Sequence, residues 1–135
     1  MPTAELVASL GAAPATDLEL ALLVEGGLPT DSVSHLRDLG LNFTEVAEII
    51  SPRTLKHRKA RGEDLSGAET DRIVRVARIL ALASRIFANR EKALLWLRST
   101  DEALQHRTPL SLLHTEFGGR LVESLLWQID EGIYT

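Results

Sequence analysis

The stretch from Ser66 to Phe87 constrains the fold more than any other part of the sequence. It opens with a capping box, Ser66-Gly67-Ala68-Glu69, and continues with apolar residues spaced for successive helical turns. One face carries Ile73, Val76, Ala77, Leu80, Ala83 and Phe87, while Val74, Ile79, Leu82 and Ile86 extend the apolar surface almost all round the helix. Such a helix must be buried. It is either the central helix of the core or a helix shared between two subunits.

Start and stop signals predict further short helices before this one. Capping residues and glycines place them at about residues 16–26, 29–39, 42–50 and 52–61. The last of these begins at Ser51-Pro52, where Ser can cap the helix and Pro is favoured at the first helical position. A short helix therefore meets a second one at a tight turn.

The segment after Phe87 also reads as helical. Thr108-Pro109 predicts a helix start, Gly118-Gly119 predicts a break, and residues 120–129 are amphipathic. No alternating apolar run indicates a strand. We therefore expect an all-α helical bundle, with a helix-turn-helix-like N-terminal half and a small helical C-terminal half.

Composition excludes several classes of protein. The 135 residues suffice for one domain, or for two small ones that share a core, and 44% hydrophobic with 25% charged residues is typical of a globular chain. The absence of cysteine excludes disulfides and thiolate metal sites. The N-terminus lacks a basic signal-peptide region, and no apolar run approaches the roughly 18 to 20 residues that span a bilayer. We expect a cytoplasmic protein without membrane contact.

Nothing in the sequence predicts an enzyme. The four histidines, His35, His57, His106 and His114, lie in separate segments without metal-ligand spacing. Ser66 and Ser111 lack the motif of a catalytic nucleophile, and capping accounts for Ser66. We therefore expect no catalytic residues, no bound metal and no cofactor.

Residues 53–61, here called the basic stripe, read RTLKHRKAR. They hold five Lys or Arg and no acidic residue, in a chain whose net charge is -4. A short helix, a tight turn and a second helix rich in Arg and Lys can place that second helix in a DNA major groove. A solvated charged face is the alternative, and we favour it less because no acidic residue balances the stripe. The predicted DNA-binding residues are Arg53, Thr54, Lys56, His57, Arg58, Lys59 and Arg61.

From about residue 17 to the end, the sequence resembles the antitoxins of the Xre/ParS type. The most specific pieces are Arg53-Thr54-Leu55 with Arg58, Leu65-Ser66 with Glu69 and Arg72, Glu91-Lys92-Ala93 with Trp96-Leu97, Pro109-Leu110, and the ending Gly132-Ile133-Tyr134-Thr135. The resemblance implies an antitoxin that neutralises a RES-domain toxin, which consumes NAD or uses it to ADP-ribosylate a target. It also implies operator DNA as a second partner. Relatives carry a Gly-Gly pair where this chain has Gln105-His106.

Composition and the resemblance together suggest how the chain is divided, since residues 1–15 are rich in Ala and contain Pro2, Gly11 and Pro14. We expect a flexible leader at residues 1–15, an Xre-like DNA-binding and dimerisation domain at residues 16–88, and a toxin-binding domain at residues 89–135, with a homodimer formed through residues 66–87. The alternative is a free-standing helix-turn-helix transcriptional regulator whose C-terminal part binds a small ligand or only dimerises.

The C-terminal tail is the predicted contact with the toxin. It combines apolar, aromatic and acidic side chains, and Gly132 can end the preceding helix. A pocket that binds NAD presents cationic groups and apolar walls, so such a tail, with its terminal carboxylate, fits the pocket or its mouth. The predicted toxin-binding residues are Trp127, Asp130, Glu131, Gly132, Ile133, Tyr134 and Thr135. Trp96 is expected in the core, whereas Trp127 is a candidate interface anchor.

Overall fold

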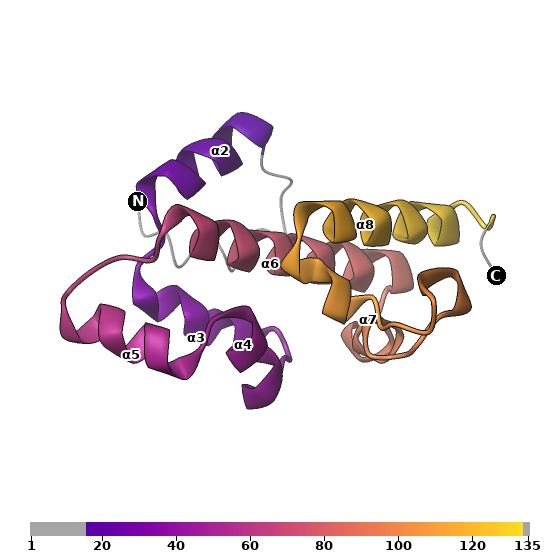
Figure 1. Ribbon diagram of the computed structural model, residues 1–135. Helices are drawn as coiled ribbons and strands as arrows, with labels where there is room; N and C mark the ends of the chain where they lie inside the picture. The colour runs from indigo at the N-terminus through magenta and orange to yellow at the C-terminus, as the bar shows by residue number, and fades with distance from the viewer. Residues whose placement is uncertain (1–15, 134–135) are drawn as a thin grey trace.

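A computed structural model describes residues 16–133 as a bundle of helices around one long central helix (Figure 1). The expected leader at residues 1–15 and the last two residues, Tyr134 and Thr135, lie outside the described residues. The elements are α2 (Asp17–Gly26), α3 (Ser34–Asp38), α4 (Phe43–Ile49), α5 (Pro52–Ala60), α6 (Gly67–Phe87), α7 (Arg90–Leu97) and α8 (Glu116–Asp130), with the 3-10 turns η1 (Thr30–Val33), η2 (Glu102–Leu104) and η3 (Leu110–His114). No strand occurs within residues 16–133, so the all-α prediction is confirmed.

The sequence allows α6 to be either the central helix of the core or a helix shared between subunits. In the structure, α6 is the central helix of the core. Its buried apolar residues are Ile73, Val74, Val76, Ala77, Ile79, Leu80, Leu82 and Ala83. Figure 1 shows it running through the middle, with α2 to α5 gathered around one end and α7 and α8 around the other. One apolar core contains residues from both ends of α6. Because these side chains are covered within a single chain, they no longer motivate a subunit interface along α6.

Capping residues begin the helices where the sequence predicts. Asn42 and Glu45 form a complete capping box at the start of α4, as do Ser66 and Glu69 at the start of α6. The hydroxyl of Ser51 accepts the N–H of Thr54 at 3.1 Å, with Pro52 at the first position of α5. The Ser51 cap and Pro52 therefore place the start of α5 directly after the turn that follows α4.

Residues 29–39 differ from the single helix that their spacing predicts. They form the 3-10 turn η1, followed by the short helix α3. Val33 and Leu36 are nevertheless buried, as the apolar spacing requires. Gly40 ends this segment with φ of 109°, and a Cβ there would lie 2.7 Å from Cδ1 of Leu94 in α7. Glycine is therefore required both by the backbone and by the close approach of α7.

The predicted break at Gly118-Gly119 is wrong. Both glycines lie inside α8, which Thr115 caps by accepting the N–H of Gly118 at 3.0 Å. A Cβ on Gly118 would overlap the carbonyl oxygen of Leu112, and one on Gly119 would lie 2.8 Å from Cδ of Arg75. These glycines allow α8 to approach its neighbours closely and do not interrupt it.

Candidate functional site

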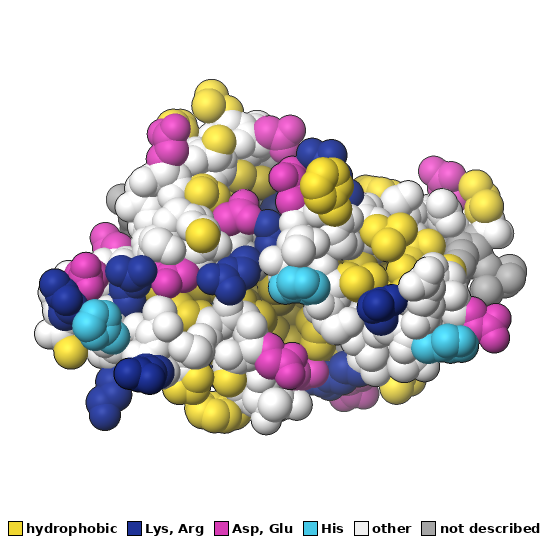
Figure 2. Space-filling model, viewed as in Figure 1, with side chains coloured by type: hydrophobic (Ala, Val, Ile, Leu, Met, Phe, Trp, Pro, Cys, Tyr) yellow, Lys and Arg dark blue, Asp and Glu magenta, His cyan; other side chains and the backbone are white. Residues whose placement is uncertain are grey.

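The basic stripe forms α5 and the residue after it, at one end of the molecule. Figure 2 shows Lys and Arg side chains gathered over this end. Arg53, Lys56, His57, Lys59 and Arg61 are exposed, whereas Thr54 is half-buried and its hydroxyl accepts a hydrogen bond from Ser51. Within residues 16–133, Arg53, Lys56 and Lys59 form no ion pair. Their charges remain available to an anionic partner.

Arg58 lies on the inner side of the basic stripe and has a different environment. Its Nε donates to Oε1 of Glu69 at 3.1 Å and its Nη2 donates to Oε2 at 3.2 Å. Its Nη1 lies 3.8 Å from Glu63, a carboxylate that also pairs with Arg61 at 3.4 Å. The expectation that no acidic residue balances the stripe is therefore wrong, because the balancing carboxylates follow it in sequence.

The electrostatics of the Arg58–Glu69 pair favour the charged form of both groups. Burial raises the pKa of the Glu69 carboxyl, but the hydrogen bonds from Arg58 and the Ser66 N–H, with the charge of Arg58, outweigh it and lower that pKa. The hydrogen bond with Glu69 correspondingly raises the pKa of Arg58 above its usual range. Arg58 therefore ties α5 to the start of α6, in addition to any contact it makes with a partner.

Arginines also tie the α5 end of the molecule to its other half. The guanidinium of Arg98, after α7, donates two hydrogen bonds of 2.8 Å to the carboxylate of Glu45 in α4 and a third of 3.0 Å to the Gly40 carbonyl. The hydrogen bond from Arg98 is the main cause of the lowered pKa of Glu45, and it outweighs burial. Arg90 donates to the Asp38 carbonyl at 3.0 Å. The sequence pattern gave no sign of these long-range contacts.

The C-terminal end of α8 has the form that the sequence predicts. Gly132 adopts φ of 76°, its N–H donates to the Ile129 carbonyl at 3.1 Å, and the N–H of Ile133 donates to the Gln128 carbonyl at 2.9 Å. This is the Schellman arrangement that glycine favours at helix ends. Ile133 is 69% exposed and Trp127 is 46% exposed, with Asp130 and Glu131 exposed between them. The described part of the tail therefore presents its apolar and acidic groups together.

The two tryptophans have different environments. Trp96 is half-buried and packs against Phe87 with ring centroids 5.9 Å apart, which confirms its place at the core. Trp127 faces outward from α8. Two further exposed side chains on α8, Phe117 and Leu121, were absent from the predicted site. Their spacing of four residues could have revealed them, because it places them on one helical face.

The described residues show no metal centre and no membrane-spanning element. Between residues 16 and 133, no group of three or more His, Asp or Glu side chains could hold a metal ion. None of the helices in that same part of the chain has the length and apolar character that a bilayer crossing requires.

Two family models match the chain, and the boundary between the two matched ranges lies inside α6. The antitoxin Xre-like helix-turn-helix domain matches residues 19–78, and the antitoxin Xre/MbcA/ParS C-terminal toxin-binding domain matches residues 82–132. Antitoxin Xre of Pseudomonas putida is 36% identical over 119 residues, which cover 87% of this chain and 75% of that protein. Antitoxin Xre of Yersinia enterocolitica is 31% identical over 87 residues, which cover 64% and 59%, respectively.

Proposed function

Because the chain belongs to the Xre antitoxin family, we propose that it binds and inhibits a cognate RES-domain toxin and represses its own operon by binding operator DNA. The main support for this proposal is that one core presents two different exposed surfaces. Exposed cations without an ion pair among the described residues lie on α5, and an apolar and acidic surface ends α8. Membership of an antitoxin family also favours a regulator without enzymatic activity.

The proposed inhibition acts through the tail that begins at Trp127. A toxin that consumes NAD, or uses it to ADP-ribosylate a target, needs cationic groups for the pyrophosphate and apolar walls for the rings. Asp130 and Glu131 match the cationic groups in charge, and Ile133 matches the apolar walls. We propose that residues 127–135 occupy or cap the NAD pocket, with Tyr134 and Thr135 at the end of the tail.

Deletion of residues 132–135 tests this mechanism. The truncated chain is expected to fold and to bind the toxin while suppressing NAD consumption less than the full chain does. A truncated chain that suppresses the toxin completely would show that the tail does not plug the pocket. A single substitution, Leu18→Ser, on an exposed position of α2, is the control for unspecific effects of surface changes.

The proposed DNA contact uses α5. Arg53, Lys56 and His57 share a helical face at spacings of three and four residues, and all three side chains are exposed. With α4 before it and the Ser51-Pro52 turn between them, α5 corresponds to the recognition helix of a helix-turn-helix. Thr54, Arg58, Lys59 and Arg61 complete the proposed contact region. Such a regulator acts where its operator lies, in the cytoplasm.

Copurification decides between this proposal and a free-standing regulator with a ligand-binding or dimerising C-terminal part. The full chain is expected to copurify with a RES-domain protein encoded beside it. A chain that binds its promoter yet leaves that neighbour unbound is a free-standing regulator. The homodimer expected through residues 66–87 stays a prediction, although the apolar side chains of α6 are buried within one chain.

A further inference from the structure

The outward face of α8 carries a row of apolar side chains that the chain itself does not cover. Phe117 is 80% exposed, Leu121 is 46% exposed and Trp127 is 46% exposed. Together with the exposed Ser124, these residues recur every three or four positions, so they lie on one face of the helix. We call Phe117, Leu121, Ser124 and Trp127 the α8 stripe.

The α8 stripe is separate from the part of α8 that stabilises the fold. Val122, Leu125 and Leu126 are buried on the opposite face, where α8 packs against α6. Helix packing therefore does not require large apolar residues on the outer face, where polar side chains would keep the helix soluble. Single exposed hydrophobic residues are common, but a row with two aromatic rings along one helix is typical of an interaction surface.

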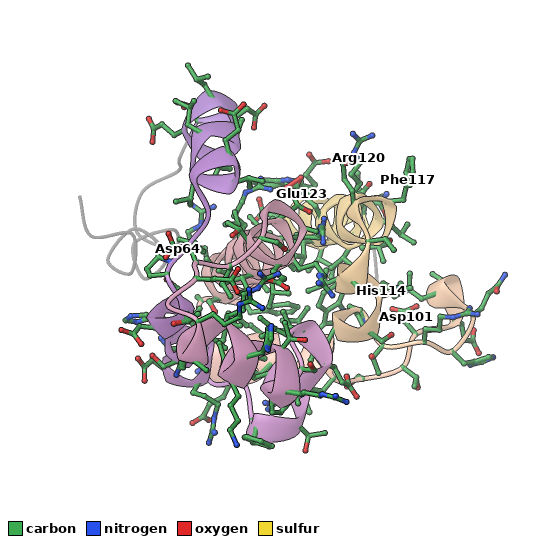
Figure 3. The ribbon with its side chains drawn as sticks, turned by 60° about the vertical axis from the view of Figure 1, so that its left-hand side comes forward. Asp64, Asp101, His114, Phe117, Arg120 and Glu123 are labelled. Carbon is green, nitrogen blue, oxygen red and sulfur yellow. The ribbon has the colours of Figure 1, made fainter. Side chains whose placement is uncertain are left out.

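Charged groups at the N-terminal end of the α8 stripe indicate what the partner surface must offer. The guanidinium carbon of Arg120 lies 5.7 Å from the ring centroid of Phe117, and its Nη2 donates to Glu116 at 2.9 Å. Figure 3 shows Phe117 and Arg120 both pointing away from the body of the molecule. Arg120 has further N–H donors beyond the one used by Glu116. A matching surface is an apolar groove with a carboxylate near the site of Arg120.

The size and position of the α8 stripe argue for the toxin as its occupant. A 15-residue helix is about 22 Å long, and one face of it is smaller than the roughly 800 Å² per partner that a stable interface buries. The partner must therefore continue beyond the helix. The α8 stripe leads at Trp127 into the acidic tail and Ile133, and it lies within residues 82–132, which match the toxin-binding domain.

We propose that the α8 stripe is the surface on which the toxin docks, with an apolar groove of the toxin over Phe117 and Leu121 and an acidic toxin side chain beside Arg120. This inference rests on the proposed antitoxin function. It assigns affinity to Phe117 and Leu121 of the α8 stripe and inhibition to the tail, with Trp127 belonging to both surfaces. In Figure 1, α5 lies at one end of the molecule and α8 runs from its middle to the other end, so the α8 stripe and the basic stripe are separate surfaces.

The test measures the affinity of the full chain for the neighbouring RES-domain protein. Phe117→Ser and Leu121→Ser are the test variants, because these residues lie about three and two helical turns before the tail begins at Trp127. Each is expected to weaken binding about tenfold or more, as the loss of a central interface side chain does. Leu95→Ser is the matched control, since Leu95 is 68% exposed on α7 within the same family match but lies off the α8 stripe. It is expected to change affinity less than about twofold.

The affinities and further measurements separate the possible failures. Wild-type affinity in both test variants overturns this inference and leaves the proposed function intact, whereas a wild-type chain that fails to bind the RES-domain protein overturns both. If the wild-type chain is a dimer in sedimentation and Phe117→Ser dissociates it, the α8 stripe binds a second copy and the inference is also overturned.

At saturating concentration, the test variants are expected to suppress NAD consumption fully, because their tail is intact. Circular dichroism is expected to show unchanged helix content in every variant, since all three positions are exposed.

Discussion

The guanidinium of Arg58 donates two hydrogen bonds to the carboxylate of Glu69, of 3.1 Å from Nε and 3.2 Å from Nη2. Glu69 is buried, and it also accepts the N–H of Ser66 at 2.8 Å in the capping box of α6. One carboxylate therefore caps the central helix and holds the basic helix α5 against it. Arg53, Lys56 and Lys59 have no ion pair among residues 16–133, whereas Arg58 has a structural role.

Removing the Arg58 side chain is expected to destabilise the fold. Arg58→Ala leaves the buried Glu69 carboxylate without its charged partner, a change that is costly in proteins. We expect the melting temperature to fall by about 5 °C, measured by circular dichroism. Lys56→Ala, on the same helix and without an ion pair, is the control and should melt with the wild type. Equal melting of both variants would show that the pair contributes nothing to stability.

Acid is expected to destabilise the protein through Glu45 and Glu69. Both have pKa values below the ordinary 4.5, in Glu45 mainly because Arg98 donates to its carboxylate. A carboxyl whose pKa is lowered by folding stabilises the fold above its ordinary pKa, and this contribution is lost as the pH falls through the lower folded value. Urea unfolding should therefore show a loss of stability that begins below about pH 4.5.

The matched variants for this pH dependence are Glu45→Gln and Glu69→Gln. Each should unfold more easily than the wild type at pH 7, and the difference should shrink as the pH falls toward 3. Constant differences at all pH values would assign the effect to packing and not to ionisation.

Operator binding is expected to depend steeply on salt. Lys56→Ala should reduce the slope of log affinity against log salt by about one unit, because one phosphate contact is lost. Arg85→Ala is the control, since Arg85 is exposed on α6 outside the basic stripe. Titration of the promoter fragment at roughly 50 to 200 mM salt measures both slopes. A wild-type affinity that does not change with salt would exclude phosphate contacts by α5.

Gly118 should tolerate no side chain. A Cβ there would overlap the Leu112 carbonyl oxygen, so Gly118→Ala is expected to destabilise the fold by about 3 kcal/mol in spite of the helix propensity of alanine. Gly67→Ala is the comparison within the same fold, because its Cβ would lie 3.8 Å from the nearest atom, the carbonyl oxygen of Val24. Urea unfolding should find Gly67→Ala neutral or slightly stabilised. Equal effects at the two positions would contradict the packing argument.

Local signals were enough to predict most helices. The capping boxes at Asn42 and Ser66, and the glycine at the end of α8, act within a few residues, so their chemistry is visible in sequence. The continuous apolar surface of residues 66–87 correctly predicted that this helix is buried. The sequence alone could not decide whether the residues that cover it belong to the same chain or to another.

Features that depend on tertiary contacts were not predictable in this way. A glycine that ends a helix and one that admits a neighbouring carbonyl look alike, which is why Gly118-Gly119 was misinterpreted. Gln105 and His106 adopt φ of 54° and 63°, so two residues that are not glycine take the left-handed conformation in this loop. Arg58 pairs with Glu69, and Arg98 pairs with Glu45. The two residues of each pair belong to different parts of the chain, and only the fold brings them together.

The position of α6 has a practical consequence for genetics. Residue 78, where the helix-turn-helix match ends, and residue 82, where the toxin-binding match begins, both lie inside this one helix. A truncation between them would cut the helix that supplies the core to both halves, so neither fragment would keep its own hydrophobic interior. Separation-of-function alleles must therefore be surface substitutions, selected for loss of operator binding in one screen and for loss of toxin protection in another.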